Sequence, residues 1–136
     1  MKNNKKGFTL VELLAVIVIL GVLLVVAVPA VNNIMKTSKE KAAKDNALMV
    51  IKALETCNMA TQTYCSAADV ANYMESSGGT LDLEYDSATG TKLVKFEISG
   101  FNGYTITITG SDMSTGGMKA AVNAGTFSGT TLTTTA

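Results

Sequence analysis

The chain has 136 residues, which is the length of one domain. Eleven lysines balance eleven acidic residues, so the formal net charge is zero and no basic excess marks a binder of polyanions. Histidine and tryptophan are absent and there are two cysteines, which excludes imidazole bases, Ser–His or Cys–His nucleophile pairs and four-ligand zinc sites built from Cys and His. No paired carboxylates stand out either. We therefore expect a structural or interaction protein, not an enzyme, with no cofactor and no metal site.

The sharpest pattern lies at the N-terminus. A short basic segment ends at Gly7, and Phe8 then opens an apolar run that a single carboxylate, Glu12, interrupts. A carboxylate at the edge of a membrane-spanning run costs roughly 1–3 kcal/mol unless a cation compensates it. Cleavage between Gly7 and Phe8 would create that cation, the new α-amine of Phe8. If Glu12 of a neighbouring copy paired with this amine, the stagger between copies would be fixed.

The apolar run is long enough to cross a membrane. From Leu13 to Met35 there are 23 residues without a charge, and a spanning helix needs about 20. The alternative of a buried core helix is disfavoured, because the rest of the chain has too few large apolar residues to surround it. Gly21 and Pro29 are the two breakers in the run, and Pro29 removes one backbone donor. We expect the helix to bend or locally melt between them on packing, although membrane helices also tolerate both residue types.

An amphipathic pattern follows from Asn32 to about Thr56 and predicts that the helix continues without a break. The charged residues Lys36, Lys39, Glu40, Lys44 and Lys52 lie mostly off its apolar stripe. Lys36, Lys39, Lys41 and Lys44 could touch nucleic-acid phosphates. Glu40 and Asp45 lie among these lysines and reduce the local positive charge, so nucleic acid is not expected as a primary ligand. The expected apolar stripe contains Ile34, Ser38, Ala42, Met49, Ala53 and Cys57, and it is broadened by Ala43, Ala47, Val50, Ile51 and Leu54.

The two cysteines, Cys57 and Cys65, are eight residues apart. On one continuous helix they would be about 12 Å apart along the axis, whereas a disulfide needs Cα atoms within about 7 Å. A bridge therefore requires the helix to end near Cys57 and the chain to double back. We expect this disulfide, with two buried thiols as the alternative.

The remaining residues predict a small α+β region. Ser66 to Asp69 has the form of a capping box that opens a short helix through about Met74. Three alternating runs then predict an antiparallel meander whose apolar face the long helix covers. The runs are Leu81–Tyr85, Val94–Ile98 and Tyr104–Ile108, with turns at 86–91 and 99–103. Residues 118–124 predict a helical turn, and 125–136 are too rich in Thr, Ser and Gly for an assignment. Asp82, Glu84, Asp86 and Asp112 could suggest calcium, but solvated strand faces explain them better.

The segment Gly7-Phe8-Thr9-Leu10-Val11-Glu12, followed directly by the apolar run, resembles the prepilins of the type IV pilin family. This family includes the pseudopilins of type II secretion and competence pilins. The resemblance covers Lys5 to about Thr56 closely and the rest only in general plan. It implies an α+β fold in which a long N-terminal helix packs against a small antiparallel sheet. It also implies a leader of residues 1–7, a helix of residues 8–56 that spans the membrane at about 8–30, and a head of residues 57–136.

The resemblance further implies cleavage after Gly7 by a prepilin peptidase, N-methylation of Phe8 and assembly through Glu12, and Gly21 and Pro29 match breaker positions of the family. The expected function is a structural subunit of a type IV pilus-like filament, held in the cytoplasmic membrane with its head outside the cytoplasm until it assembles at the cell surface. The expected partners are other copies of the chain, the peptidase, the pilus assembly machinery and membrane lipid. Many type IV pilins carry a disulfide near the C-terminus, which this chain cannot form.

Two other interpretations stay open. The chain could be a pseudopilin or competence pilin that serves secretion or DNA uptake. The N-terminus could instead be a conventional secretory signal, with residues 2–6 as its basic region, Leu13 to Val28 as its apolar core and a small-residue cleavage site at Val28-Pro29-Ala30. Glu12 and the length of the apolar run disfavour that signal. The intact mass separates the two processing schemes, because the mature chain would begin at Phe8 in one and at Val31 in the other.

Overall fold

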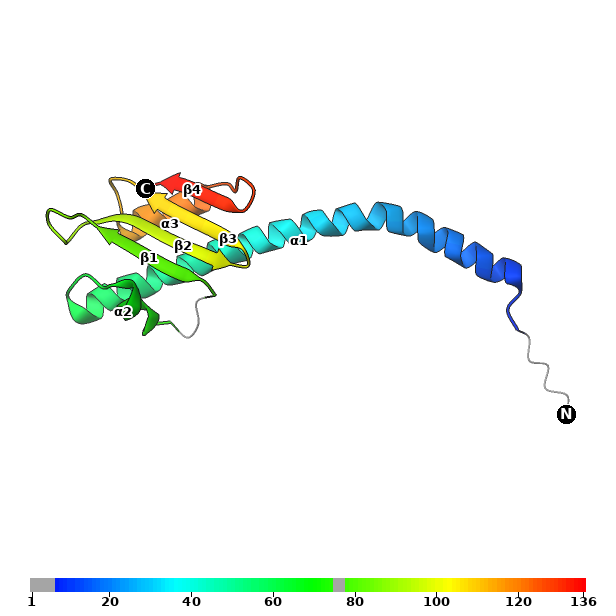
Figure 1. Cartoon of the computed structure of the whole chain (residues 1–136), viewed down its shortest axis with the longest axis horizontal. Coiled ribbons are helices and arrows are strands. Elements are labelled where there is room, and N and C mark those ends of the chain that lie inside the picture. The colour runs from blue at the N-terminus through cyan, green and yellow to red at the C-terminus, as the bar shows by residue number, and fades with distance from the viewer. Residues whose placement is uncertain (1–6, 75–77) are drawn as a thin grey trace, which may run out of the picture. The chain divides into compact units, whose positions relative to one another are not determined.

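The structure is a computed structural model that describes residues 7–74 and 78–136. Clustering of contacts divides the chain into two compact units, Met1–Thr37 and Ser38–Ala136, with the boundary inside the first helix. The expected leader lies outside the described residues, except for Gly7. The elements along the chain are α1 (Leu10–Thr61), α2 (Ala67–Ala71), β1 (Thr80–Tyr85), β2 (Leu93–Phe101), β3 (Tyr104–Thr109), α3 (Thr115–Ala124) and β4 (Thr131–Thr135) (Figure 1).

Helix α1 is unbroken through Gly21 and Pro29 and ends about one turn later than the sequence suggests. Its last turn is closed by the Thr61 hydroxyl, which donates to the Cys57 carbonyl at 2.9 Å. Gln62 then adopts a left-handed backbone conformation with φ of 55°. A left-handed residue directly after the last turn is a common way to end a helix.

The second half of α1 packs on one face of the sheet, in the unit that begins at Ser38. Ala47, Val50, Ile51 and Leu54 are buried there, as expected, but Met49 is 62% exposed. The predicted stripe was therefore too wide, because Met49 lies on the helix about 100° from Val50 and turns away from the sheet. The core cluster to which these helix positions belong also includes Val70, Phe96, Ile98, Ile106, Ile108, Met118, Val122 and Leu132.

The sheet has the order β1-β2-β3-β4, and its first three strands form the predicted antiparallel meander. The fourth strand, β4, was not predicted, and it pairs with β3 in parallel, from Thr105 opposite Thr131 to Thr109 opposite Thr135. The sheet is therefore mixed, not purely antiparallel. Parallel neighbours need a crossover connection, and α3 supplies it. Leu132 pairs with Ile106 and is fully buried, which ties β4 to the core.

Two local irregularities shift the expected register of β2. Tyr85 pairs with Leu93 and Glu84 pairs with Lys95, so Val94 is the extra residue of a β-bulge. Leu93 is consequently buried and Val94 is only half-buried. At the other end, the register with β3 shifts between Ile98 and Phe101. Strand β2 runs to Phe101, so the turn predicted at 99–103 is only the two residues Asn102-Gly103, with φ of 52° and 80°, which matches the Asn-Gly preference of tight hairpins.

The acidic residues for which calcium was considered have other interactions. Lys95 Nζ lies 3.5 Å from Asp82 and 3.4 Å from both Glu84 and Glu97 on the open face of the sheet. The Asp86 carboxylate accepts hydrogen bonds from Ala88 and Thr89 within its own turn. Within the described residues, no group of three or more His, Cys, Asp and Glu could hold a metal ion.

The predicted pairing of Cys57 with Cys65 is present, with the two Cα atoms 6.2 Å apart. The chain doubles back as the spacing required, and the turn is fixed by hydrogen bonds. The Cys65 N–H donates to Asn58 Oδ1 at 2.9 Å, and the Tyr85 hydroxyl donates to the Cys65 carbonyl at 2.7 Å. Both sulfur-bearing residues are almost fully buried. The disulfide therefore joins the end of α1 to the loop before α2, next to the sheet.

Candidate functional site

The Gly7–Phe8 peptide bond lies in a short exposed segment that precedes the first residue of α1. The Phe8 side chain is 84% exposed, and a Cβ added at Gly7 would meet no other atom within 4 Å. The fold of this chain therefore imposes no requirement for glycine at position 7. A peptidase can bind an exposed, non-helical peptide bond of this kind.

Glu12 takes part in a capping box at the start of α1. The Thr9 N–H donates to Glu12 Oε2 at 2.8 Å, and the Glu12 N–H donates to the Thr9 hydroxyl at 3.3 Å. These reciprocal bonds satisfy two backbone donors that a helix start otherwise leaves without a partner. A carboxylate is also favoured there by the helix dipole. Sequence reasoning missed the role of Thr9, although Thr9-x-x-Glu12 has the spacing of a capping box.

The first unit presents apolar side chains on every side of α1. All nineteen large apolar residues between Phe8 and Met35 expose at least half of their surface, the least exposed being Val31 and Met35 at 51%. Leaving such a side chain in water instead of burying it costs about 1.5–3 kcal/mol. Nineteen of them would cost several times the total stability of an ordinary domain, about 5–15 kcal/mol. This surface is therefore suited to lipid or to other helices.

By length and composition, α1 is the one helix among the described residues that could cross a membrane. Gly21 and Pro29 both lie in its apolar part, where the ribbon stays helical (Figure 1). Pro29 has no N–H to donate to the Val25 carbonyl, and a Cβ at Gly21 would meet open space. Neither residue is explained by packing within this chain, and both lower the intrinsic stability of the helix.

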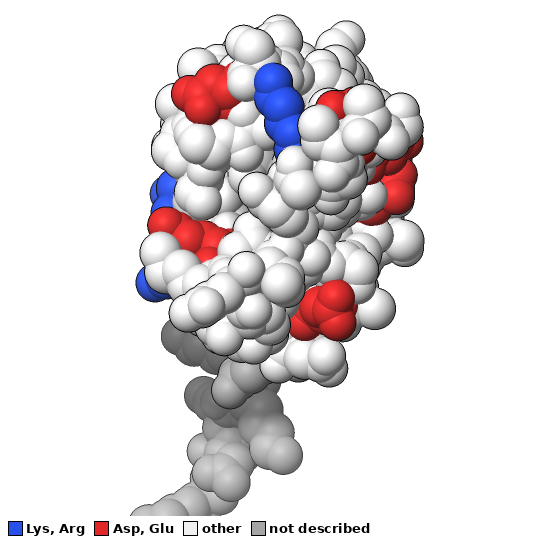
Figure 2. Space-filling view, turned by 90° about the vertical axis from the view of Figure 1, so that its left-hand side faces the viewer, with Lys and Arg blue, Asp and Glu red and all other residues white. Residues whose placement is uncertain are grey.

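Of the lysines after the apolar run, Lys44 has hydrogen-bond partners within the second unit. Lys44 Nζ donates to the carbonyls of Asn123 and Gly125 at 3.4 and 2.5 Å, which places a cation at the C-terminal end of α3. On the face of the head that Figure 2 shows, the basic groups are scattered among acidic and uncharged ones. Lys44 therefore has a structural role within the second unit, where it holds α3 against α1.

Of the site residues expected from the sequence, the structure brings Gly7, Phe8 and Glu12 together at the start of α1. Gly21 and Pro29 follow further along the same apolar segment. Cys57 and Cys65 belong to the other compact unit. The N-terminal residues therefore form one candidate site and the disulfide forms a separate structural element.

Comparison with known proteins identifies this N-terminal arrangement. Residues 2–28 match the family model described as the prokaryotic N-terminal methylation motif. The chain is 37% identical to the type IV major fimbrial protein FimA of Dichelobacter nodosus over 57 residues, which is 42% of this chain and 36% of that protein. It is 50% identical to the type II secretion system core protein G of Dickeya chrysanthemi over 56 residues, or 41% and 34% of the two chains.

The chain thus spans about a third of the length of the curated relatives that it matches. No solved structure matches it significantly. The chain is therefore similar, over about two fifths of its length, to a type IV fimbrial protein and to a type II secretion system core protein, and its residues 2–28 match the methylation motif.

Proposed function

We propose that this protein is a structural subunit of a type IV pilus-like filament. A prepilin peptidase removes residues 1–7 and the new N-terminus, Phe8, is methylated. Residues 8 to about 30 hold the subunit in the cytoplasmic membrane, with the head outside the cytoplasm, and the assembly machinery then polymerises it. The observation that carries this proposal is the apolar segment of α1, exposed on every side of the helix, with one capped carboxylate at its start.

On assembly, the apolar segment exchanges one set of neighbours for another. In the membrane its side chains contact lipid, and in a filament they contact the same segment of other copies. Lipid tails are as apolar as leucine, so the gain on assembly comes from side-chain packing and from polar pairs. Glu12 supports such a pair, because its hydrogen bond from Thr9 leaves acceptor capacity on the carboxylate. The α-amine of Phe8 from a neighbouring copy is the partner that we assign to it.

Mass spectrometry of the native protein combined with electron microscopy tests the proposal. The expected mature chain begins at Phe8 and carries one extra methyl group, and the expected material is a filament whose main band is this chain. A mature chain that begins at Val31, or a monomer that keeps Met1, would disprove the proposal. Because the cleavage site and the filament are measured separately, failure of processing can be told apart from failure of assembly.

The bend that we assign to Gly21–Pro29 belongs to the assembled state, since α1 is continuous in the single chain. Replacing Pro29 with Ala restores the donor to the Val25 carbonyl. We expect hydrogen exchange of the amides around residues 21–29 to become slower in the filament, with Val28→Ala as the control that changes side-chain size and no backbone donor. Equal exchange in Pro29→Ala and native filaments would refute the bend.

A second candidate function is that of a pseudopilin or competence pilin, favoured by the 50% identity to the secretion system core protein G. The two roles differ in the filament that they produce. Long surface pili composed mainly of this chain support the first role. A short filament within the cell envelope, together with a secretion or DNA-uptake defect in a deletion strain, supports the second.

A further inference from the structure

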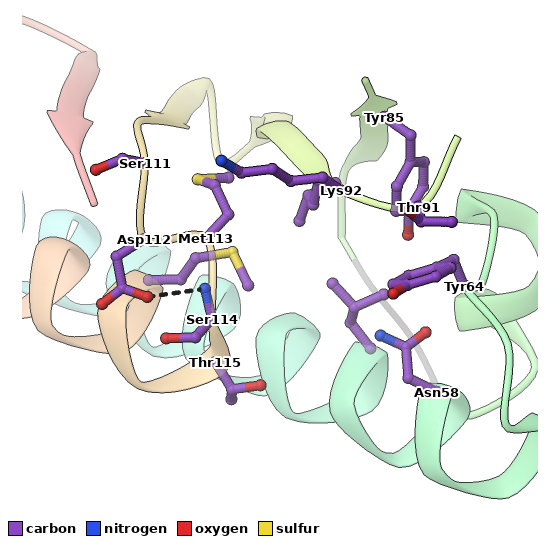
Figure 3. A pocket seen from close by; sticks show the side chains of 13 residues that line it. Asn58, Tyr64, Tyr85, Thr91, Lys92, Ser111, Asp112, Met113, Ser114 and Thr115 are labelled. Carbon is purple, nitrogen blue, oxygen red and sulfur yellow. Dashed lines mark hydrogen bonds between the residues drawn. The ribbon is translucent and has the colours of Figure 1, made fainter. Parts of the chain in front are cut away.

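A cavity of about 330 Å³ opens in the second unit, between the end of α1, the β1–β2 turn and the loop that leads into α3 (Figure 3). Its volume lies at the lower end of the range of ligand pockets, about 300–1,000 Å³. The buried side chains of Leu54, Leu93 and Met118 form an apolar floor, and polar side chains surround the opening. The proposed filament function assigns no role to this cavity.

One wall of the cavity is aromatic. Tyr64 is 57% exposed although it packs edge to face against Tyr85, with ring centroids 6.0 Å apart and planes at 62°. The Tyr85 hydroxyl is held by the Cys65 carbonyl, next to the disulfide. Tyr85 is therefore held in place before any ligand arrives, and Tyr64, which packs on it, directs its hydroxyl toward the cavity (Figure 3).

Asn58 and Asp112 line opposite sides of the opening, and internal hydrogen bonds hold both side chains. Asn58 Oδ1 accepts from the Cys65 N–H at 2.9 Å, so the amide NH₂ of Asn58 points toward the cavity as a donor (Figure 3). Asp112 Oδ1 accepts from the Ser114 N–H at 3.3 Å, and Asp112 Oδ2 would lie 2.7 Å from a Cβ at Gly117, so this carboxylate lies against the start of α3 at the edge of the cavity. Lys92 crosses the upper rim as a second donor.

The chemistry of the rim restricts the class of ligand. Lys92 and Asp112 carry opposite charges, so an anion would meet the carboxylate and a cation would meet the ammonium. A purely apolar chain would leave the rim groups without hydrogen bonds, at a cost. A neutral sugar ring instead offers an apolar C–H face to the Tyr64 ring and hydroxyls to the Asn58 amide and the Lys92 ammonium. We propose that this cavity binds one unit of a neutral saccharide, independently of whether the chain forms filaments.

Saturation-transfer difference NMR on the full chain, in dodecylphosphocholine micelles that carry no sugar headgroup, tests this site. Glucose, galactose and N-acetylglucosamine are the neutral probes, with glucuronate, glucosamine and decanoate as the charged and apolar alternatives. A single ring in a pocket of this size is expected to bind with a Kd in the millimolar range. We expect saturation transfer to at least one neutral sugar, and several-fold weaker binding of its charged counterparts.

Matched variants locate the binding. Tyr64→Ala removes the aromatic wall, and Asn58→Asp removes the amide donor while keeping an acceptor for the Cys65 N–H. Each should weaken sugar binding at least about tenfold, whereas Tyr73→Ala removes an exposed tyrosine outside the cavity and should leave binding unchanged. An amide spectrum and an intact disulfide show that each variant is folded. Binding of decanoate alone, no transfer to any neutral sugar, or equal binding by folded Tyr64→Ala would each overturn the proposal.

Discussion

The Thr9 N–H and Glu12 Oε2 are joined by a hydrogen bond of 2.8 Å at the first turn of α1, and the Thr9 hydroxyl accepts a hydrogen bond from the Glu12 N–H in return. Glu12 therefore combines two properties that can be separated experimentally. Its oxygen caps the helix within one chain, and its charge is available to a cation on another chain. Loss of assembly in a Glu12→Ala variant alone would not distinguish them, because alanine removes both.

Glu12→Gln should separate the charge from the cap. Glutamine at this position can still complete a capping box, but it cannot form an ion pair with the Phe8 amine. We expect processing at Gly7 to continue in both variants, and filament yield to fall at least about tenfold in both, because breaking a buried charge pair costs about 3–5 kcal/mol. Hydrogen exchange at the start of α1 should remain native-like in Glu12→Gln only. Normal filament yield from Glu12→Gln would contradict the charge-pairing account.

Thr9→Val tests the other half of the capping box. Valine keeps the branched shape and removes the hydroxyl that accepts from the Glu12 N–H, which should weaken the helix start by about 1 kcal/mol. We expect several-fold faster hydrogen exchange of the first α1 amides in micelles. Thr37→Val is the matched control, since the Thr37 hydroxyl donates back to the Asn33 carbonyl in mid-helix and caps no terminus. Equal exchange in the two variants would show that Thr9 does not cap α1.

The sequence was most informative where local chemistry decides the structure. The Ser66 capping box was predicted from its spacing and is present, with both reciprocal hydrogen bonds. The Cys57–Cys65 bridge was predicted from the distance that a continuous helix would impose. The three strands of the meander were visible because their apolar residues alternate. In each case, residues close together in the sequence determine the local structure.

Nonlocal features were not predictable in the same way. Strand β4 has one large apolar residue, Leu132, among threonines, and its pairing with β3 depends on the crossover through α3. The direction in which Met49 points depends on which side of α1 meets the sheet, and the periodic pattern alone allowed both sides. The cavity is lined by segments far apart in the sequence. The fold brings these segments together, so no single sequence motif predicts the cavity.

Removal of the disulfide should destabilise the second unit. In the chain-entropy account, a loop of this length contributes roughly 2–3 kcal/mol to the free energy of unfolding, and the buried positions of Cys57 and Cys65 favour alanine as the replacement. We expect the Tm of the native protein to fall by several degrees after its disulfide has been reduced. The Cys57→Ala/Cys65→Ala variant should have the lower Tm with or without reductant. An unchanged Tm of the native chain after verified reduction would contradict this prediction.

Ser66 and Asp69 provide a test of the pH dependence of the α2 cap. The Ser66 hydroxyl and then its N–H donate to Asp69 Oδ2, at 2.6 and 3.0 Å, and they hold the pKa of this carboxyl below its ordinary value of 3.8.

Because the pKa is lower in the folded chain, the stabilising contribution is present above the ordinary pKa and is lost as the pH falls through the folded value. Ser66→Ala should therefore raise the pKa of Asp69 and destabilise the protein at neutral pH, with a smaller difference in strong acid. Carboxyl NMR titration and Tm against pH measure the two effects, with Ser87→Ala, an exposed serine in the β1–β2 turn, as the control. If the pKa of Asp69 is the same in Ser66→Ala and in the native chain, the hydrogen bonds from Ser66 do not stabilise the ionised carboxylate.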